Sequence, residues 1–395
     1  MEIAESLSGY LPIDCGIQTA VDSLRERVAS AAFKAASYLT DPICKGHEYF
    51  RRLYLVDSLN EQSYWISNLA RKALLMTALV GCVSMSTLTT LPGIVLRSFA
   101  SSIQKQPYVS VVDGEGRELG ADRSFSLLSW NVCGVSAGYA ISDGGVMPIA
   151  FRMDRILNKI IEKDADVNCC YEVFDVNTGY SMAEKLKQHG YTDFYFHFGS
   201  RGVGVSSGIF VASKYRIANP EFTPFSQDML IGRTKNCAKG VFGFDLESKG
   251  NRFARIFATH LQHSEAPEFP TPEEVEARKR QMCLIADKVS AVGNRTVLVT
   301  GDLNLDDREY ELSNWKDRFV KGDEFQVKTW GGDGFCAAIV GKPISQGLNL
   351  DHTMAAKGSI RSIQTTIVET GFDGTVFKEE ALSDHSGLFS RVCVR

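Results

Sequence analysis

The sequence predicts an α/β fold, with sheets covered by helices, preceded by a helical, hydrophobic N-terminal segment. Apolar and β-branched runs alternate with amphipathic stretches after about residue 122, and a run of 24 uncharged residues precedes them. The 395 residues, 44% hydrophobic and 23% charged, suffice for one large core and an accessory segment. We therefore predict four parts, namely an N-terminal helical region over 1–72, a hydrophobic membrane-associated segment over 73–105, a linker over 106–122 and a catalytic domain over 123–395.

The spacing of apolar residues predicts the order of helices and strands in the catalytic part. The stretch 152–163 places its isoleucines and leucine on one helical face. A second helix is expected to begin after Thr271, because threonine is a good N-cap, Pro272 suits the first helical position and Glu274 completes a capping box. Strands are predicted around these helices, at residues 125–130, 167–171, 208–213, 252–259 and 296–300.

Composition limits the classes of function. The formal net charge of -4 gives no overall positive field, so nucleic acid is not a favoured partner. The ten cysteines form no CxxC pair and no zinc-ligand spacing, which indicates reduced thiols in a protein that faces the cytosol. The first twenty residues lack a basic start and a continuous apolar stretch, so no secretory signal peptide is expected.

Residues 73–96 form an uncharged run that Lys72 and Arg97 close. As a helix, 24 residues at about 1.5 Å each reach roughly 36 Å, enough for a bilayer core of about 30 Å. Pro92 and Gly93 are expected to kink or break that helix near its end. Basic residues on both sides favour a re-entrant hairpin with both ends and the catalytic domain in the cytosol. The alternatives are a single span of the membrane and a buried helix of a soluble subdomain.

Short polar strings follow the predicted strands. Taken alone, an asparagine after a strand is usually a turn former, and a histidine on a strand is usually a core residue. Together the strings indicate one active site, because α/β sites are commonly built where strands end. They are Ser129-Trp130-Asn131, Tyr171-Glu172-Val173-Phe174-Asp175, Thr259-His260-Leu261-Gln262, Gly301-Asp302-Leu303-Asn304 and Ser383-Asp384-His385.

In this order, with Leu350-Asp351 before the last string, residues 124–395 resemble the endonuclease/exonuclease/phosphatase superfamily. The resemblance implies a DNase I-like four-layer sandwich, in which two packed β-sheets are flanked by helices. Further strings resemble those of membrane-associated neutral sphingomyelinases, which implies hydrolysis of a membrane phospholipid, sphingomyelin, to ceramide and phosphocholine. These strings are Glu172-Val173-Phe174-Asp175, Ala238-Lys239-Gly240-Val241, and residues 207–215 and 258–262.

The resemblance also implies a metal cofactor. Mg²⁺ prefers oxygen ligands and retains several water molecules, so one carboxylate with one helper suffices to hold it. We expect Glu172 and the amide oxygen of Asn131 to bind Mg²⁺, with Mn²⁺ as the alternative ion. Asp384 is expected either to bind a second metal ion or to support the ligands.

The remaining strings carry the implied catalytic and substrate-binding groups. Asp302 would orient and deprotonate the attacking water, with Asn304 holding water or a phosphate oxygen. His385 would reach the same phosphate, and Asp351 would fix its tautomer. His260 would donate to a non-bridging or leaving oxygen. Whether Asp302 or His385 is the base stays open at this point.

The sequence departs from the sphingomyelinase pattern in places. Tyr171 stands where glutamine usually precedes the metal-binding glutamate, and His352 stands where a tyrosine is usual. Thr234 replaces an aspartate that is thought to pair with the lysine matching Lys239, which argues against a lipid-triggered switch. Lys239 itself is either a substrate-phosphate ligand or a solvated lysine at a strand edge.

Other functions stay open on the sequence. A nuclease, or an inositol-phosphate or phosphoinositide phosphatase, would use the same site, and a basic groove beside His260 and Asp302 would favour it. A non-catalytic membrane-bound interaction protein is the second alternative, although every expected catalytic group is retained. No protein partner can be inferred.

Overall fold

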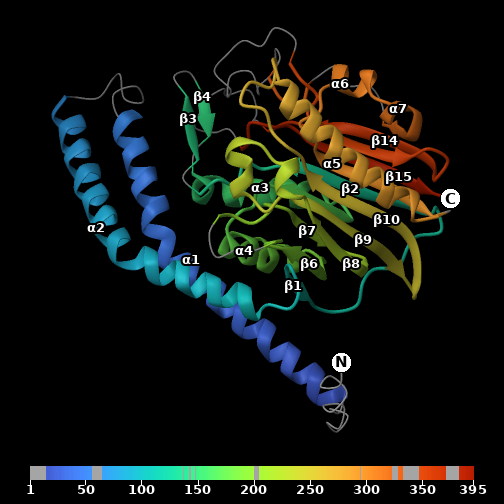
Figure 1. The fold of residues 1–395 in the computed structure, drawn as a ribbon, viewed down its shortest axis with the longest axis horizontal. Coiled ribbons are helices and arrows are strands. Elements are labelled where there is room, and N and C mark those ends of the chain that lie inside the picture. The colour runs from blue at the N-terminus through green and yellow to red at the C-terminus, as the bar shows by residue number, and fades with distance from the viewer. Residues whose placement is uncertain are drawn as a thin grey trace, which may run out of the picture.

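The structure is a computed structural model in which two β-sheets pack face to face, with helices on their outer sides and a long helical pair at the N-terminal end (Figure 1). Residues 1–14 and 56–64 of the predicted N-terminal region lie outside the described residues. The described residues are 15–55, 65–136, 138–141, 144–146, 148–199, 204–293, 295–322, 328–331, 347–370 and 382–395.

Both sheets are mixed. In the first sheet β2 and β5 run parallel, and in the second β10 and β11 do, while the other described neighbours run antiparallel. The first sheet has the order β1 (Val109–Val112), β6 (Asp193–Phe196), β7 (Phe210–Ser213), β5 (Val167–Tyr171), β2 (Ser124–Asn131), β15 (Gly387–Val394) and β14 (Ile360–Val368). The second has the order β12 (Phe319–Lys321), β13 (Asp351–Ala356), β11 (Thr296–Asp302), β10 (Asn251–His260), β9 (Gly240–Ser248) and β8 (Arg216–Pro224), and β3 (Tyr139–Ile141) pairs separately with β4 (Gly144–Val146).

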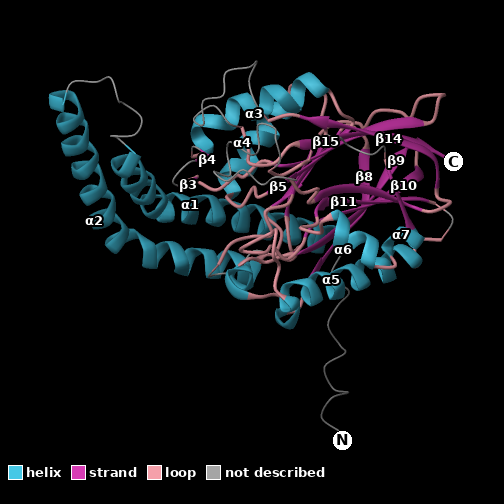
Figure 2. Ribbon diagram, turned by 90° about the horizontal axis from the view of Figure 1, so that it is seen from above, coloured by secondary structure: helices cyan, strands magenta, loops and turns pink. Residues whose placement is uncertain are grey.

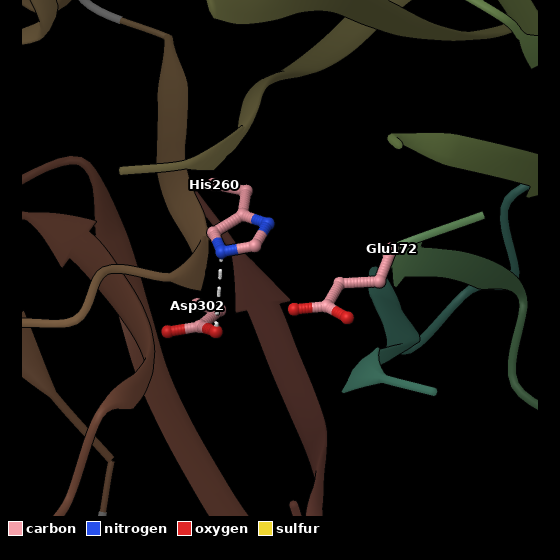
Figure 3. Close-up of side chains that lie close together, drawn as sticks. All are labelled: Glu172, His260 and Asp302. Atoms are coloured by element: carbon pink, nitrogen blue, oxygen red, sulfur yellow. Dashed lines mark ion pairs between the residues drawn. The ribbon is translucent and has the colours of Figure 1, made fainter. Parts of the chain in front are cut away.

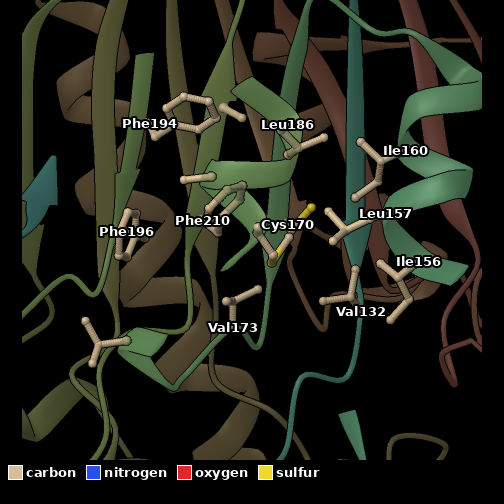
Figure 4. Packing of buried hydrophobic residues seen from close by; sticks show 14 of the residues in the cluster. Val132, Ile156, Leu157, Ile160, Cys170, Val173, Leu186, Phe194, Phe196 and Phe210 are labelled. Carbon is tan, nitrogen blue, oxygen red and sulfur yellow. The ribbon is translucent and has the colours of Figure 1, made fainter. Parts of the chain in front are cut away.

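Apolar clusters between the layers hold the sandwich together. One lies between the sheets, one lies between the first sheet and its helices, and one lies between the second sheet and its helices. Figure 4 shows the cluster between the first sheet and its helices. There, Ile156, Leu157 and Ile160 lie toward Cys170 of β5 and toward Val132, which directly follows β2. The helices are α3 (Ile149–Lys163) and α4 (Val176–Lys187) on the first sheet, and α5 (Pro272–Ser290), α6 (Asp307–Leu312) and α7 (Trp315–Arg318) on the second. The predicted four-layer sandwich is confirmed.

Local signals set several element boundaries. Helix α5 starts as predicted, because Thr271 Oγ1 accepts a hydrogen bond from Glu274 N at 3.3 Å and the Glu274 carboxylate accepts one from Thr271 N at 2.9 Å. The predicted linker contributes β1 to the edge of the first sheet. Tyr108, just before β1, is buried in the apolar cluster between the sheets, so this connection is ordered.

Strand register brings the polar strings to one edge of the sandwich. Asn131 lies opposite Tyr171 in the parallel pair of β2 and β5. Asp302 lies opposite His260 in the parallel pair of β10 and β11, and opposite Asp351 in β13. Because β2 and β11 face each other across the two sheets, the ends of these strands converge. Residues far apart in the sequence thus meet at this edge.

Helices α1 (Cys15–Leu55) and α2 (Trp65–Ile103) form an antiparallel pair. The predicted boundary between residues 72 and 73 falls inside α2. The helices approach closely at Gly93, where a Cβ would lie 2.8 Å from Thr40 Cγ2, so a larger residue would separate them. The base of the pair docks on the sandwich, because Phe33 and Ala100 belong to the cluster under the first sheet. The far end projects away from both sheets (Figure 2).

Helix α2 is long and apolar enough to cross a membrane, by length and composition. None of its most apolar window is buried against the described residues, which contradicts the alternative of a buried helix in a soluble subdomain. The helix continues past Pro92 and Gly93 and bends along its length (Figure 1). Proline removes one helical hydrogen bond and crowds the preceding turn, which accounts for a bend rather than a break.

The docked base predicts that α1 contributes to the stability of the catalytic domain. Phe33 is 2% exposed, and its ring packs edge-on against His197 with centroids 4.9 Å apart. Phe33→Ala should lower the free energy of unfolding by about 3 kcal/mol, measured by urea unfolding. Tyr38→Ala on the same helix is the control, because Tyr38 is 70% exposed and its loss should have little effect. If Phe33→Ala and the wild type had equal free energies of unfolding, the helical pair would not contribute to the hydrophobic core of the catalytic domain.

Candidate active site

Asp302, at the end of β11, is the centre of the converging strand ends. Its Oδ2 accepts a hydrogen bond from Asn131 Nδ2 at 2.9 Å, and its Oδ1 accepts one from the Asn304 backbone N–H at 3.0 Å. The same Oδ2 lies 3.4 Å from His260 Nε2 and 3.8 Å from His385 Nε2. The carboxylate is 2% exposed and is therefore held by these partners rather than by bulk water. The structure thus brings these five predicted residues together.

Glu172 follows β5 and extends its carboxylate toward Asp302 and His260 (Figure 3). Asn131 Nδ2 also donates to Glu172 Oε1 at 3.1 Å, so one amide links the two carboxylates. The backbone of Glu172 is left-handed, with φ 66°. A Cβ on Gly134 would lie 2.5 Å from the Glu172 carbonyl oxygen, so glycine is required for this close approach.

His385 and Asp351 form a buried pair in which His385 Nδ1 lies 2.8 Å from Asp351 Oδ2. This contact turns the other ring nitrogen, Nε2, toward Asp302. Burial opposes charge on His385, but the carboxylates of Asp351, Asp302 and Asp384 outweigh it and raise the His385 pKa well above its usual value. Burial raises the pKa of Asp351 to about 6, although His385 opposes the rise. The arrangement favours an imidazolium held by carboxylates, as expected for the supporting role of Asp351.

The carboxylates of Asp384 and Asp302 both repel the Glu172 carboxylate. Burial raises the pKa of Glu172 to about 7, and Asp384 adds to the rise. In the described part of the chain, ligand atoms that lie within 4.8 Å of one another occur in two groups. They are Glu172, His260 and Asp302, and Asp302, Asp351 and His385. Carboxylates crowded together at a largely desolvated site without a cation are costly, so an ion fits the donor set.

The first of these groups fits a metal ion better. In the second, Asp351 and His385 already satisfy each other, so an ion there would have to displace that hydrogen bond. In the first, Glu172 and Asp302 offer the oxygen ligands that Mg²⁺ prefers. Asp384 is near enough to raise the Glu172 pKa, but it belongs to neither group among the described residues.

Asn131 lies in the site but its amide is turned away from the expected role. The Asn131 Oδ1 atom accepts a hydrogen bond from the Cys133 backbone N–H at 2.9 Å, and the Nδ2 atom faces Glu172 and Asp302. In this arrangement Asn131 orients the two carboxylates. Its oxygen as a metal ligand stays a prediction.

Lys239 is 4% exposed, so the solvated strand-edge alternative is wrong. Its Nζ donates to the Leu261 carbonyl oxygen, and burial lowers its pKa to about 8, against the opposing effect of nearby acidic groups. The hydroxyl of Thr234 lies 2.9 Å from His263 Nδ1 and accepts from Gln262 Nε2 at 3.0 Å. Thr234 therefore belongs to a separate polar network.

Among the buried polar atoms at the site that make no hydrogen bond to the described residues are His260 Nδ1 and Asn304 Nδ2. Buried polar groups are normally paired, so both atoms are available to a ligand. Burial lowers the pKa of His260 well below its usual value, and Lys239 lowers it further, so the ring is neutral. Both residues were expected to contact the phosphate, and the structure leaves them free to do so.

Some supporting residues have no role in the sequence-based prediction. Ser383 Oγ donates to the Asn131 carbonyl oxygen at 2.6 Å, and Trp130 Nε1 donates to the His385 carbonyl oxygen at 2.9 Å. Both residues lie inside the polar strings, so their place beside predicted site residues is the signal in the sequence that could have identified them. Thr329 Oγ1 accepts from the backbone N–H of Asp351 at 3.2 Å. Thr329 lies outside the strings, and no local pattern marks it.

Comparisons with known proteins agree with this fold. The profile described as "Endonuclease/Exonuclease/phosphatase family" matches residues 128–385. Sphingomyelinase C from Streptomyces griseocarneus is 20% identical, with a TM-score of 0.53, over 68% of this chain and 99% of that chain. A beta toxin mutant from Staphylococcus aureus, "with bound magnesium ions", has the same identity, TM-score and coverage. TDP2 from C. elegans is 16% identical, with a TM-score of 0.50, over 88% of this chain and 94% of that chain. Curated protein sequences gave no match.

The raised pKa of Glu172 predicts that its charge destabilises the metal-free protein. Between the ordinary glutamate pKa and about 7, the folded state binds a proton that the unfolded state releases, so the free energy of unfolding falls as pH rises. Glu172→Gln should therefore be about 3 kcal/mol more stable than wild type at pH 7.5 in EDTA, with the difference vanishing toward pH 4.5.

Urea unfolding at both pH values measures this difference. Glu162→Gln is the matched control, because the Glu162 side chain is 60% exposed. If Glu172→Gln and the wild type lost the same stability between these pH values, the carboxylate would not be a source of strain.

Proposed function

The chain belongs to the endonuclease/exonuclease/phosphatase family, and we propose that it is a magnesium-dependent phosphodiesterase that hydrolyses sphingomyelin to ceramide and phosphocholine. The observation that carries the phosphodiesterase proposal is the convergence of Glu172 and Asp302 beside the buried pair of His385 and Asp351. The exposed apolar face of α2 supports a membrane lipid as the substrate. The structural similarity to sphingomyelinase C supports the same choice.

Glu172 would hold the magnesium ion, with the Asp302 carboxylate beside it. When bound, the ion neutralises negative charge on the phosphate and lowers the pKa of bound water. The beta toxin structure with bound magnesium ions supports this choice of metal. Asn131 keeps both carboxylates aimed at one point, since its amide donates to each of them.

Two different side chains carry out the two proton transfers. His385, as an imidazolium, has no free site for a proton, so we assign the base to Asp302. Asp302 takes a proton from the attacking water as the new oxygen–phosphorus bond forms. His385 gives a proton to the ceramide oxygen as the old bond breaks. His260, Asn304 and Lys239 would contact the phosphate oxygens, and the unpaired buried atoms His260 Nδ1 and Asn304 Nδ2 support this for the first two.

The helical pair would bind the membrane surface. Exposed apolar side chains on α2 include Leu74, Val80, Leu88, Leu91 and Val95. The partner helix α1 carries charged residues, among them Asp41, Lys45 and Glu48, which line a cavity together with Asp175 of the catalytic domain. Taking these charges across a bilayer with α2 would be costly. Surface insertion of α2, with both ends and the catalytic domain on the cytosolic side, is therefore favoured over a span.

The proposal predicts phosphocholine release from sphingomyelin vesicles in the presence of magnesium, and none in EDTA. Asp302→Asn should lower kcat by roughly 100-fold or more at saturating magnesium, because metal cannot replace a base. Glu172→Gln should instead recover part of its rate as magnesium is raised. The measurement is phosphocholine release against magnesium concentration.

Plasmid DNA and inositol phosphates belong in the same assay. Cleavage of either without phosphocholine release would replace the lipid assignment by one of the alternatives on the same site. Rescue of Asp302→Asn by magnesium, with Glu172→Gln insensitive to it, would exchange the two roles.

Removing the projecting end of the helical pair should separate membrane binding from hydrolysis. Residues 43–90 can be replaced by a short Gly/Ser linker, because the chain is close on both sides of this segment, where Gly93 contacts Thr40. The variant should lose sedimentation with vesicles yet still hydrolyse the water-soluble diester bis(p-nitrophenyl) phosphate at about the wild-type rate. Retained vesicle binding would place the membrane contact elsewhere.

A further inference from the structure

Arg152, in the first turn of α3, is fully buried with 0% of its surface exposed. Its guanidinium donates to three backbone carbonyl groups. Nη1 donates to Val132 O at 3.0 Å and to Leu382 O, and Nη2 donates to Cys133 O at 2.5 Å. The planar fork of arginine suits such a set of acceptors, since its donors diverge in fixed directions.

These carbonyls belong to two segments that carry the active site. Val132 and Cys133 directly follow Asn131, whose amide links Glu172 and Asp302. Leu382 comes before Ser383, Asp384 and His385. The Arg152 side chain therefore joins the segment after Asn131 to the segment before Ser383, about 250 positions further along the chain. Its own bond to Leu382 spans 230 positions.

The neighbouring contacts show why this junction needs support. Cys133 has a left-handed backbone, with φ 47°, which costs about 1–3 kcal/mol for a residue other than glycine. Arg152 binds the carbonyl of that residue, and Asn131 Oδ1 binds its N–H. Ser383 adds a second tie, because its hydroxyl donates to Asn131 O and accepts from His385 N at 3.2 Å.

We propose that Arg152 is a positioning residue for phosphodiester hydrolysis. It holds the Asn131 turn and the Asp384-His385 segment in fixed relation, so that the metal-binding Glu172, the base Asp302 and the proton donor His385 face the same phosphate. Burying a guanidinium is costly. If this position only packed α3 against the sheet, an apolar residue would suffice, so the arginine points to a further role. The proposal rests on the proposed function, since it concerns the same site.

The test compares Arg152→Met and Arg152→Lys in the full chain, at a temperature where circular dichroism shows folded protein. Because small misplacement of reacting groups costs up to about 100-fold, Arg152→Met should lower kcat by about 100-fold with little change in KM for sphingomyelin in mixed micelles. Arg152→Lys should recover part of the rate, because lysine keeps the charge but lacks the fork. Arg155→Met on the same helix is the control and should match wild type.

Magnesium affinity gives a second measurement that does not need turnover. In the thermal stabilisation of each variant by magnesium, Arg152→Met should need about tenfold more metal for half the effect, in keeping with losses on removing groups that support metal ligands. Ser383→Ala should shift kcat in the same direction, and it keeps the proposal testable if Arg152→Met does not fold. A lower melting temperature with unchanged kcat and unchanged magnesium dependence would overturn the proposal.

The two proposals fail in different ways. If the wild type does not release phosphocholine, the sphingomyelin assignment fails, and the Arg152 comparison continues with bis(p-nitrophenyl) phosphate and the magnesium measurement. If the wild type is active and the Arg152 variants match it, positioning by Arg152 fails alone.

Discussion

The repulsion between clustered carboxylates at the edge of the sandwich is the constraint on which the site depends. Glu172, Asp302 and Asp384 arrive from separate strand ends, and burial already raises the Glu172 pKa to about 7. Such a cluster does not assemble by itself, so the packed sheets must hold it together. The cost of its charge is also what makes it a good binding site for a cation. Strain adds to this cost, since Glu172, Cys133 and Asn304 all have left-handed backbones.

Much of the fold could be predicted because its signals are local. Apolar periodicity marked the strands, and the Thr271 capping box marked the start of α5 within one residue. The convergence of the polar strings could also be anticipated. In each sheet the parallel pair aligns two predicted site strings, as with His260 and Asp302, so strand order alone brings them to one edge.

The features that could not be predicted depend on long-range packing. Arg152 read as an ordinary first-turn residue of a helix, and only the fold shows that its carbonyl partners belong to two site segments. The direction of the Asn131 amide is fixed by the Cys133 N–H, which composition does not reveal. The hydrogen bond from Lys239 Nζ to the Leu261 carbonyl oxygen likewise depends on the fold, because Leu261 follows a different strand. A pattern of residue types carries no information on such contacts.

The connection between the helical pair and the site is also a matter of packing rather than of a flexible linker. Ser37 of α1 donates to Asp175, which caps α4 and stands three positions after Glu172. Arg97 of α2 donates to the Gly204 carbonyl oxygen at 3.1 Å, and Tyr108 is buried between the sheets. The base of the helical pair is therefore fixed to the loop that carries Glu172. Since that base is fixed, a membrane that holds α2 would also set the orientation in which the catalytic edge meets the lipid.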